Sequence, residues 1–253
     1  MLRSELSLHK KPAGRDRYIL IDISPSPGVV GLIISNLLTD SLASEKIGEI
    51  YSPHFPQVTL INNDGVASLP KVEIYEIKPT DKNNTSIILI TRNFLIDSNE
   101  AGEEVSELIF ELLGEKKISE VVLLSSARVS GTGDVFASST VLDITREFLQ
   151  LGAKTTPNTE ALPIDKLASS LLFTLYIKGV PVSLLISDTV SYMPDLAAAK
   201  KLINILSKYL GISVDVSKLD QEIEKQRVIF EEIERAIREE FREKGGRPPS
   251  YIG

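Results

Sequence analysis

Several residue types that carry chemistry in proteins are missing or scarce in this chain of 253 residues. Cysteine is absent, which excludes disulfide bonds, thiol nucleophiles and thiolate metal sites. The two histidines, His9 and His54, lie far apart, and a zinc site would need several further ligands. Tryptophan is absent and aromatic residues make up only 6%, which disfavours a platform for stacking bases. We therefore expect no metal and no cofactor.

Basic stripes and long apolar runs are also missing. The net charge is −7, so a nucleic-acid partner is not expected. No apolar run approaches the roughly 20 residues that span a bilayer, and the N-terminus lacks a signal-like apolar core. Hydrophobic residues at 42% and charged residues at 25% are ordinary for a globular protein. These observations predict a cytoplasmic protein without membrane association.

Four short runs of apolar residues predict strands that are buried on both faces of a sheet. The runs are Tyr18–Ile23, Ile87–Ile90, Val121–Leu124 and Val182–Ser187. Helical patterns lie between them, so the connections are long enough for the strands to pair in parallel. The expected helices are Val29–Leu38, a segment capped by Ser98, Thr140–Leu151, a mostly buried Pro163–Tyr176, and Leu196–Leu210. The sequence therefore predicts an α/β fold, a three-layer α/β/α domain over residues 1–216.

Three segments depart from this alternation. Residues Met1–Arg17 are polar and basic, which fits an arm or an edge strand. Ser41–Lys46 is expected to continue the first helix or to start a further turn. From Ile47 to Lys78, short apolar pieces are separated by prolines and by the turn at Asn62–Gly65. This pattern predicts a hairpin insertion on one side of the main sheet.

The last part of the chain is a charged helical stretch over residues 217–244, followed by a tail over residues 245–253 that is expected to be flexible. One apolar stripe runs along the helix, formed by Ile223, Phe230, Ile233, Ile237 and Phe241. Such a stripe packs on its own domain or a sister subunit, or it pairs with a partner helix. The tail ends in Tyr251, Ile252 and Gly253, which fits either a docking peptide with a terminal carboxylate or a frayed end.

Candidate chemistry within the domain is sparse. The loop Ser130–Asp134 contains Gly131 and Gly133 and follows Arg128, so its amides could hold a phosphate, although a plain loop is the more common explanation of such residues. Several aspartates, among them Asp22 and Asp188, lie at predicted strand ends, where α/β active sites occur but where helix caps and turns are also common. No nucleophile elbow, P-loop or dinucleotide fingerprint is present. We therefore do not expect an enzyme.

Taken in order, several segments resemble the PAC2 family, the proteasome assembly chaperone 2 group, and most closely its archaeal members. The matching segments span nearly the whole chain, and their order and spacing carry the resemblance more than any one of them. They are Pro27–Gly31, Ile47–Phe55 with Gly65 and Pro70, Ile87–Ile90, Pro163–Ala168, Pro194–Leu202, and Leu210–Asp215 with Leu219 and the terminal helix.

This resemblance implies a fold similar to purine nucleoside phosphorylases, used without known catalysis. It also implies a homo-oligomer that acts as an ATP-independent assembly chaperone or activator and binds proteasome α subunits. In such members, a tail ending in a hydrophobic residue, a tyrosine and any last residue inserts between α subunits. The resemblance thus assigns partner binding to Tyr251, Ile252 and Gly253.

The end of this chain departs from that order. Tyr251 is third from the end, Ile252 is penultimate, and Ser250 stands where an apolar residue is expected. Either the tail docks in a shifted register, or this chain does not bind the proteasome in that way. The alternative function from another class is a nucleoside- or phosphate-binding protein, or a phosphorylase-like enzyme, that uses Arg128 and the Gly131–Asp134 loop.

Overall fold

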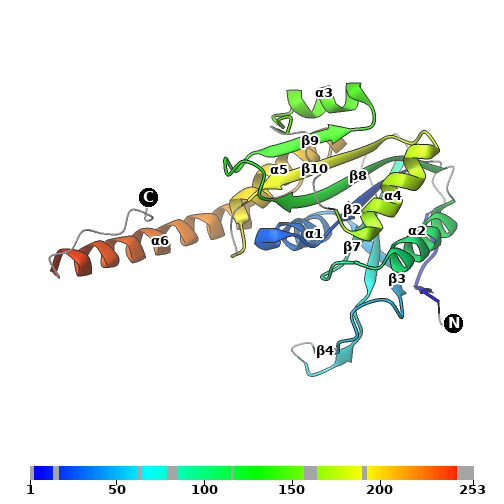
Figure 1. Cartoon of the computed structure of the whole chain (residues 1–253), viewed down its shortest axis with the longest axis horizontal. Helices are drawn as coiled ribbons and strands as arrows, with labels where there is room; N and C mark the ends of the chain where they lie inside the picture. The colour runs from blue at the N-terminus through cyan, green and yellow to red at the C-terminus, as the bar shows by residue number, and fades with distance from the viewer. Residues whose placement is uncertain are drawn as a thin grey trace. The chain divides into compact units, whose positions relative to one another are not determined.

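The computed structural model describes residues 3–13, 17–61, 64–78, 85–114, 117–156, 164–189 and 193–243 (Figure 1). The chain separates into two compact units, Met1–Val214 and Asp215–Gly253. The first unit is an α/β domain. The second contains one long helix.

The strands are β1 (Glu5–Leu8), β2 (Arg17–Ile23), β3 (Ser44–Tyr51), β4 (Leu60–Ile61), β5 (Ala67–Ser68), β6 (Val72–Ile77), β7 (Thr85–Thr91), β8 (Ile118–Ala127), β9 (Val135–Ser139) and β10 (Val182–Asp188). The helices are the 3-10 turn η1 (Pro27–Val29), α1 (Val30–Ser41), α2 (Asn99–Leu113), α3 (Leu142–Gln150), α4 (Lys166–Ile177), α5 (Leu196–Leu210) and α6 (Ser217–Glu243). Among the helices of the described ranges, none combines the length and the apolar content that a membrane span requires.

One mixed sheet organises the first unit. Its strand order is β1-β3-β6-β7-β2-β8-β10-β9, and the four central strands β7, β2, β8 and β10 run parallel. These are the four strands that the apolar runs predict, so the expected parallel centre is confirmed. The outer strands on both sides are antiparallel to their neighbours.

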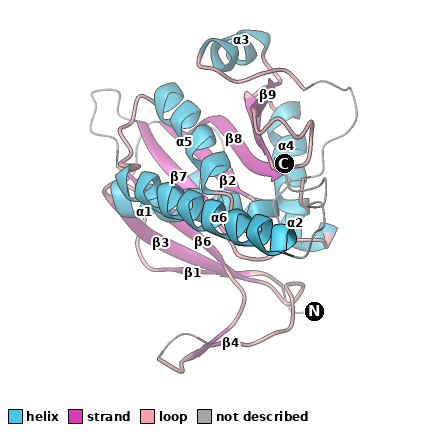
Figure 2. Ribbon diagram, turned by 90° about the vertical axis from the view of Figure 1, so that its left-hand side faces the viewer, coloured by secondary structure: helices cyan, strands magenta, loops and turns pink. Residues whose placement is uncertain are grey.

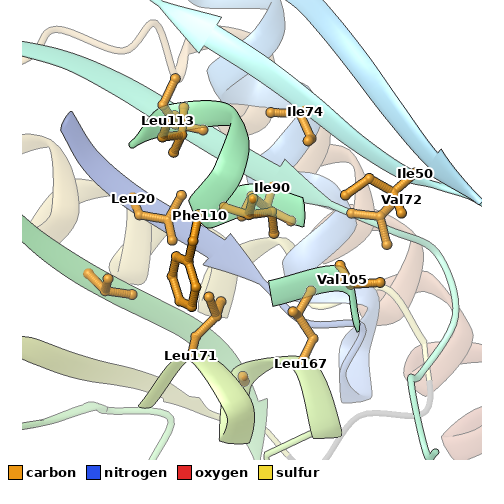
Figure 3. Close-up of a cluster of buried hydrophobic side chains, with 14 of the residues drawn as sticks. Leu20, Ile50, Val72, Ile74, Ile90, Val105, Phe110, Leu113, Leu167 and Leu171 are labelled. Atoms are coloured by element: carbon orange, nitrogen blue, oxygen red, sulfur yellow. The ribbon is translucent and has the colours of Figure 1, made fainter. Parts of the chain in front are cut away.

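Helices cover both faces of the parallel centre, which explains why its strands are apolar throughout. Helices α2 and α4 lie on one face, and α1 and α5 lie on the other (Figure 2). The core under α2 and α4 is a contiguous cluster that joins strand residues such as Leu20 and Ile90 to Val105, Phe110 and Leu171 of the helices (Figure 3). At the β9 edge, the rings of Phe148 in α3 and Tyr209 in α5 are 4.2 Å apart.

The expectations for the first third of the chain need correction. Residues Ser41–Lys46 do not extend the helix, because α1 ends at Ser41 and β3 begins at Ser44. The predicted hairpin does lie on one side of the parallel strands, but its strands β3 and β6 are part of the main sheet. Among the described strands, only β4 and β5 form a separate hairpin. Glu5–Leu8 forms an edge strand on β3, one of the two predicted outcomes for the N-terminal segment.

Strand β9 was missed by the sequence analysis, because Val135 and Phe136 are only two strongly strand-forming residues between a glycine loop and a run of serines. It pairs antiparallel with β10.

The expectation that the helix Pro163–Tyr176 is mostly buried is also wrong. The side chains of Phe173, Tyr176 and Ile177 in α4 are all exposed.

A close approach of α2 and α4 fixes the layer on that face. Gly102 is buried in α2, and a Cβ atom added there would lie 2.5 Å from the carbonyl oxygen of Lys166 in α4. Four residues further along, the hydroxyl oxygens of Ser106 and Ser170 are 2.8 Å apart. Only glycine allows the two backbones to come this close at the first contact.

Replacing Gly102 with alanine is therefore expected to lower the free energy of unfolding by about 1–3 kcal/mol, the usual cost of overpacking. This loss occurs although alanine is intrinsically the better helix former by about 1 kcal/mol. Urea denaturation measures it. Glu103→Ala, at an exposed site on the same helix, is the control and should change stability by less than about 0.5 kcal/mol. A Gly102→Ala protein as stable as the parent would contradict the close packing.

Candidate functional site

The carboxyl ends of the four parallel strands meet at one edge of the sheet, where open α/β proteins bind their ligands. The most favourable point at such an edge lies between two neighbouring strands whose following helices pack on opposite faces of the sheet. Strands β2 and β7 are such a pair, because β2 is followed by α1 and β7 by α2. The crevice between the ends of β2 and β7 is therefore the expected position of a ligand site.

The side chain of Arg92, the residue directly after β7, fills this crevice. Its Nη1 atom lies 2.5 Å from Oδ1 of Asp22 in β2, and its Nη2 atom lies 2.6 Å from Oδ2 of Asp165. The Nε atom donates a further bond of 2.9 Å to Asp165, and Nη2 donates one of 3.1 Å to the hydroxyl of Ser24. The guanidinium therefore joins the ends of two strands to the residue that caps α4.

The ion-paired group is shielded from water. The side chains of Arg92 and Asp22 are fully buried, and that of Asp165 is 2% exposed. Burial alone would lower the pKa of Arg92, but the carboxylates of Asp22 and Asp165 raise it above its usual value. Asp165 also accepts a hydrogen bond from the amide of Ala168, so it closes the first turn of α4. The cluster is thus a structural joint in which one guanidinium serves two carboxylates, and burial raises the pKa of Asp22 above its usual value despite the nearby Arg92.

Little room remains beside this joint. The opening lined by Thr91 and Asn93 on one side and by Ser35 and Asn36 of α1 on the other has a volume of about 200 Å³. Small-molecule sites usually measure about 300–1,000 Å³. Among the residues that the structure describes, this opening is therefore smaller than an ordinary substrate pocket.

The second candidate, the loop after β8, also holds a group of the same chain. The carboxylate of Asp188, at the end of β10, accepts hydrogen bonds from the amides of Val129 and Thr132 at 2.8 and 2.7 Å. The amides of Ser130 and Gly133 donate at 3.2 and 3.1 Å, and the Ser130 hydroxyl donates at 2.9 Å. An external phosphate would have to displace Asp188 from these donors.

The predicted residues of this loop divide into two groups. Gly131 and Gly133 have positive φ values of 75° and 65°, which bend the loop around the carboxylate. Arg128 is exposed and lies outside the hydrogen bonds that hold Asp188. Burial on its own would raise the pKa of Asp188, but the hydrogen bonds from Val129, Ser130 and Thr132 lower it to about 2.

Another aspartate of the same edge caps a helix. The side chain of Asp195 accepts from the amide of Ala198 at the start of α5 and from the Thr189 hydroxyl at 2.6 Å. Its own amide donates to the carbonyl of Gly28 at 2.8 Å, which ties the loop after β10 to the turn after β2. In that turn Val29 has a left-handed φ of 54°, a strained conformation for a β-branched residue.

The residues predicted for partner binding lie in the second unit. Helix α6 begins at Ser217, whose amide donates to the Asp215 carboxylate at 2.9 Å, and Ile223 is half-buried. The rest of the predicted stripe falls on described helical backbone, but its side chains lie outside the described part. These residues are Phe230, Ile233, Ile237 and Phe241. Tyr251, Ile252 and Gly253 also lie outside the described residues.

Arg92 was missed by the sequence analysis, although it leaves a signal. A single arginine stands two residues after the apolar run Ile87–Ile90, at the edge where Asp22 was already noted. A charge at such a position needs a partner when it is buried. What no local pattern supplies is the position of Asp165, which is 73 residues away in sequence. Within the described ranges, no group of three or more acidic or histidine side chains is arranged to hold a metal ion.

Comparisons with known proteins agree on one group. The model of the PAC2 family matches residues 20–234. The uncharacterized protein MJ1210 of Methanocaldococcus jannaschii is 22% identical over 246 residues, which cover 94% of this chain and 93% of that protein. Two solved structures from Pyrococcus furiosus share the fold. PbaB, an archaeal proteasome activator, is 24% identical with a TM-score of 0.79, covering 92% of this chain and 100% of that chain. PbaA, an archaeal homolog of proteasome-assembly chaperone, is 25% identical with a TM-score of 0.66, covering 96% and 98%.

Removing the guanidinium should destabilise the domain strongly, because it leaves two buried carboxylates without their counter-charge. We expect Arg92→Met to lower the free energy of unfolding by about 3–5 kcal/mol. Chemical denaturation measures the loss. Arg146→Met is the matched control, since Arg146 pairs with Asp143 on the surface and should contribute less than about 1 kcal/mol. Equal effects of the two substitutions would show that the buried joint does not carry the fold.

The hydrogen bonds that the loop after β8 donates to Asp188 predict that the free energy of unfolding depends on pH. Its pKa of about 2 in the folded chain lies below the ordinary value of 3.8, so the folded state favours the ionised form. The stabilisation is complete above about pH 5 and is lost as the pH falls through about 2, a change of about 2 kcal/mol. Asp188→Asn should remove this component, so the stability difference between the parent and the variant should shrink between pH 5 and pH 2. A stability difference that stays constant with pH would contradict the stabilising role of these hydrogen bonds.

Proposed function

Because the chain belongs to the PAC2 family, we propose that it acts in the proteasome system as an assembly chaperone or activator and not as an enzyme. Its likeness in fold to PbaB, an archaeal proteasome activator, supports this proposal. The finer part of the proposal is that the chain forms a homo-oligomer and binds proteasome α subunits.

One structural observation carries the non-enzymatic part. Both positions at the sheet edge where an α/β protein would receive a ligand hold the chain's own side chains. Arg92 fills the crevice between β2 and β7, and the amides of the loop after β8 donate their hydrogen bonds to Asp188. A domain arranged in this way is suited to present surfaces and not to enclose a substrate.

The phosphate-binding alternative gains no support from the loop geometry. Binding would require the ionised Asp188 to give up its hydrogen bonds, which hold its pKa at about 2. The cost of moving this buried carboxylate away from its donors opposes an incoming anion.

We propose that the contact with α subunits is made by the end of the chain, residues 250–253. Tyrosine offers an apolar ring and a hydroxyl group at low entropic cost, and a terminal carboxylate adds a charge that a lysine can receive. In an oligomer, several tails would act together, and the effective concentration of the second tail would strengthen binding without any new contact. Pairing of helix α6 through its apolar stripe is the proposed route to the oligomer.

Deleting Ser250–Gly253 should abolish binding to proteasome α-subunit rings while leaving the fold and the oligomeric state intact. Loss of the Tyr251 and Ile252 side chains should weaken affinity by roughly 100-fold or more, given the apolar surface each can bury. Retention of labelled α rings on immobilised protein measures binding, and light scattering measures the oligomer. Unchanged retention after the deletion would refute the tail as the docking element.

Exchanging the last two side chains tests the register. The double variant Tyr251→Ile with Ile252→Tyr has the same composition but places tyrosine in the penultimate position. If the tail docks in the order expected for the family, this variant binds more tightly than the parent. If the shifted register is the functional one, the exchange weakens binding, and Tyr251→Ala alone does the same.

A further inference from the structure

Helices α2 and α4 present a groove on the outer side of the layer that they form. The two helices run side by side in the same direction, from Gly102 beside Lys166 to Ser106 beside Ser170. The groove between them has a volume of about 740 Å³. Its lining residues include Glu103, Glu107 and Glu111 from α2, and Lys166, Phe173 and Lys178 from α4 and its end.

One wall of this groove is acidic. Glu103, Glu107 and Glu111 follow one another at intervals of four residues, so their carboxylates lie along one side of α2. All three are exposed, and none forms an ion pair with another residue of the described ranges. The whole helix contains five glutamates and no basic residue. Like charges at this spacing disfavour a helix, so the row is unfavourable for the isolated chain.

The other wall is mixed, because Lys166 and Lys178 lie toward the two ends of α4 and the apolar ring of Phe173 lies between them. Phe173 is 67% exposed, and Tyr176 and Ile177 are 62% and 66% exposed on the same side of α4. At the end of the groove, the Lys178 ammonium lies 5.8 Å from the centre of the Phe110 ring. Exposed aromatic side chains beside a groove are typical anchors of protein contacts, because they bury a large area when a partner covers them.

We propose that this groove binds an amphipathic helix of a partner protein that has an apolar side and, next to it, lysines or arginines spaced four residues apart. The apolar side would cover Phe173 and Ile177, and the basic residues would pair with the row of glutamates. Charge argues against a second copy bound with α2 against α2, because that contact would bring the two glutamate rows together. The proposal does not depend on the tail, which lies in the other unit of the chain.

The test uses the full-length protein and two fluorescein-labelled synthetic helical peptides. The first has leucine along one side and lysines spaced four residues apart beside it. In the second, each lysine is replaced with glutamate. Fluorescence anisotropy at physiological ionic strength should show binding of the basic peptide, whereas the acidic peptide should stay free. Binding of both peptides with equal affinity would overturn the proposal, because charge complementarity would then have no part in the contact.

Variants locate the contact on the surface. The triple substitution of Glu103, Glu107 and Glu111 with glutamine should weaken binding of the basic peptide about tenfold, since each surface ion pair contributes a little. Substituting Glu5, Glu147 and Glu222 with glutamine changes the net charge equally at exposed sites elsewhere and should weaken binding less than about twofold. Equal losses in the two triple variants would show general attraction to an acidic protein and would overturn the site.

The apolar part of the α4 wall is tested by Phe173→Ser, which replaces an exposed side chain and should leave the melting temperature nearly unchanged. We expect this substitution to weaken binding of the basic peptide about tenfold or more. Unaltered affinity would refute the groove as the binding site. Conversion of an oligomer into monomers by Phe173→Ser would also overturn the proposal, because the groove would then be an interface between copies of this chain.

Discussion

The domain depends on one arginine that has no access to water. Arg92 stands where two neighbouring strands end and where their helices leave to opposite faces, and its guanidinium binds Asp22 of one strand and Asp165 at the start of α4. A buried charge of this kind is tolerated only when its partners are fixed in place. The three groups therefore hold the sheet, the α2–α4 layer and the loop between them in one arrangement.

The same edge of the sheet supports the proposal that the fold serves contacts with partners and not chemistry. In related architectures this edge is left open and receives substrate. Here the positions are taken by Arg92 and by Asp188, whose ionised form is favoured by the loop around it. In the described part of the domain, the α2–α4 groove and the exposed side chains of α4 remain available for contacts.

The sequence alone predicts the parallel centre of the sheet, because strands covered on both faces are apolar throughout and need no knowledge of their partners. It predicts the outer strands less well. Val135–Ser139 is too short and too polar to stand out, and Ser44 begins a strand only because Glu45–Ile50 pairs with β6 and β1. The Arg92 joint could not be predicted, since Asp165 reaches it from a distant segment. The glycine loop was recognised as a cradle for an anion, but residue types could not say that Asp188, 55 residues away from Gly133, would supply one.

That loop has a consequence for how the family's fold can diversify. A carboxylate that accepts hydrogen bonds from the loop amides keeps these amides oriented toward one point. Loss of this one acidic side chain to a small residue would expose four amide donors that are already oriented, with Arg128 nearby on the surface. In this loop, a receptor for a small oxyanion is therefore one substitution away from the arrangement in which Asp188 occupies the amides.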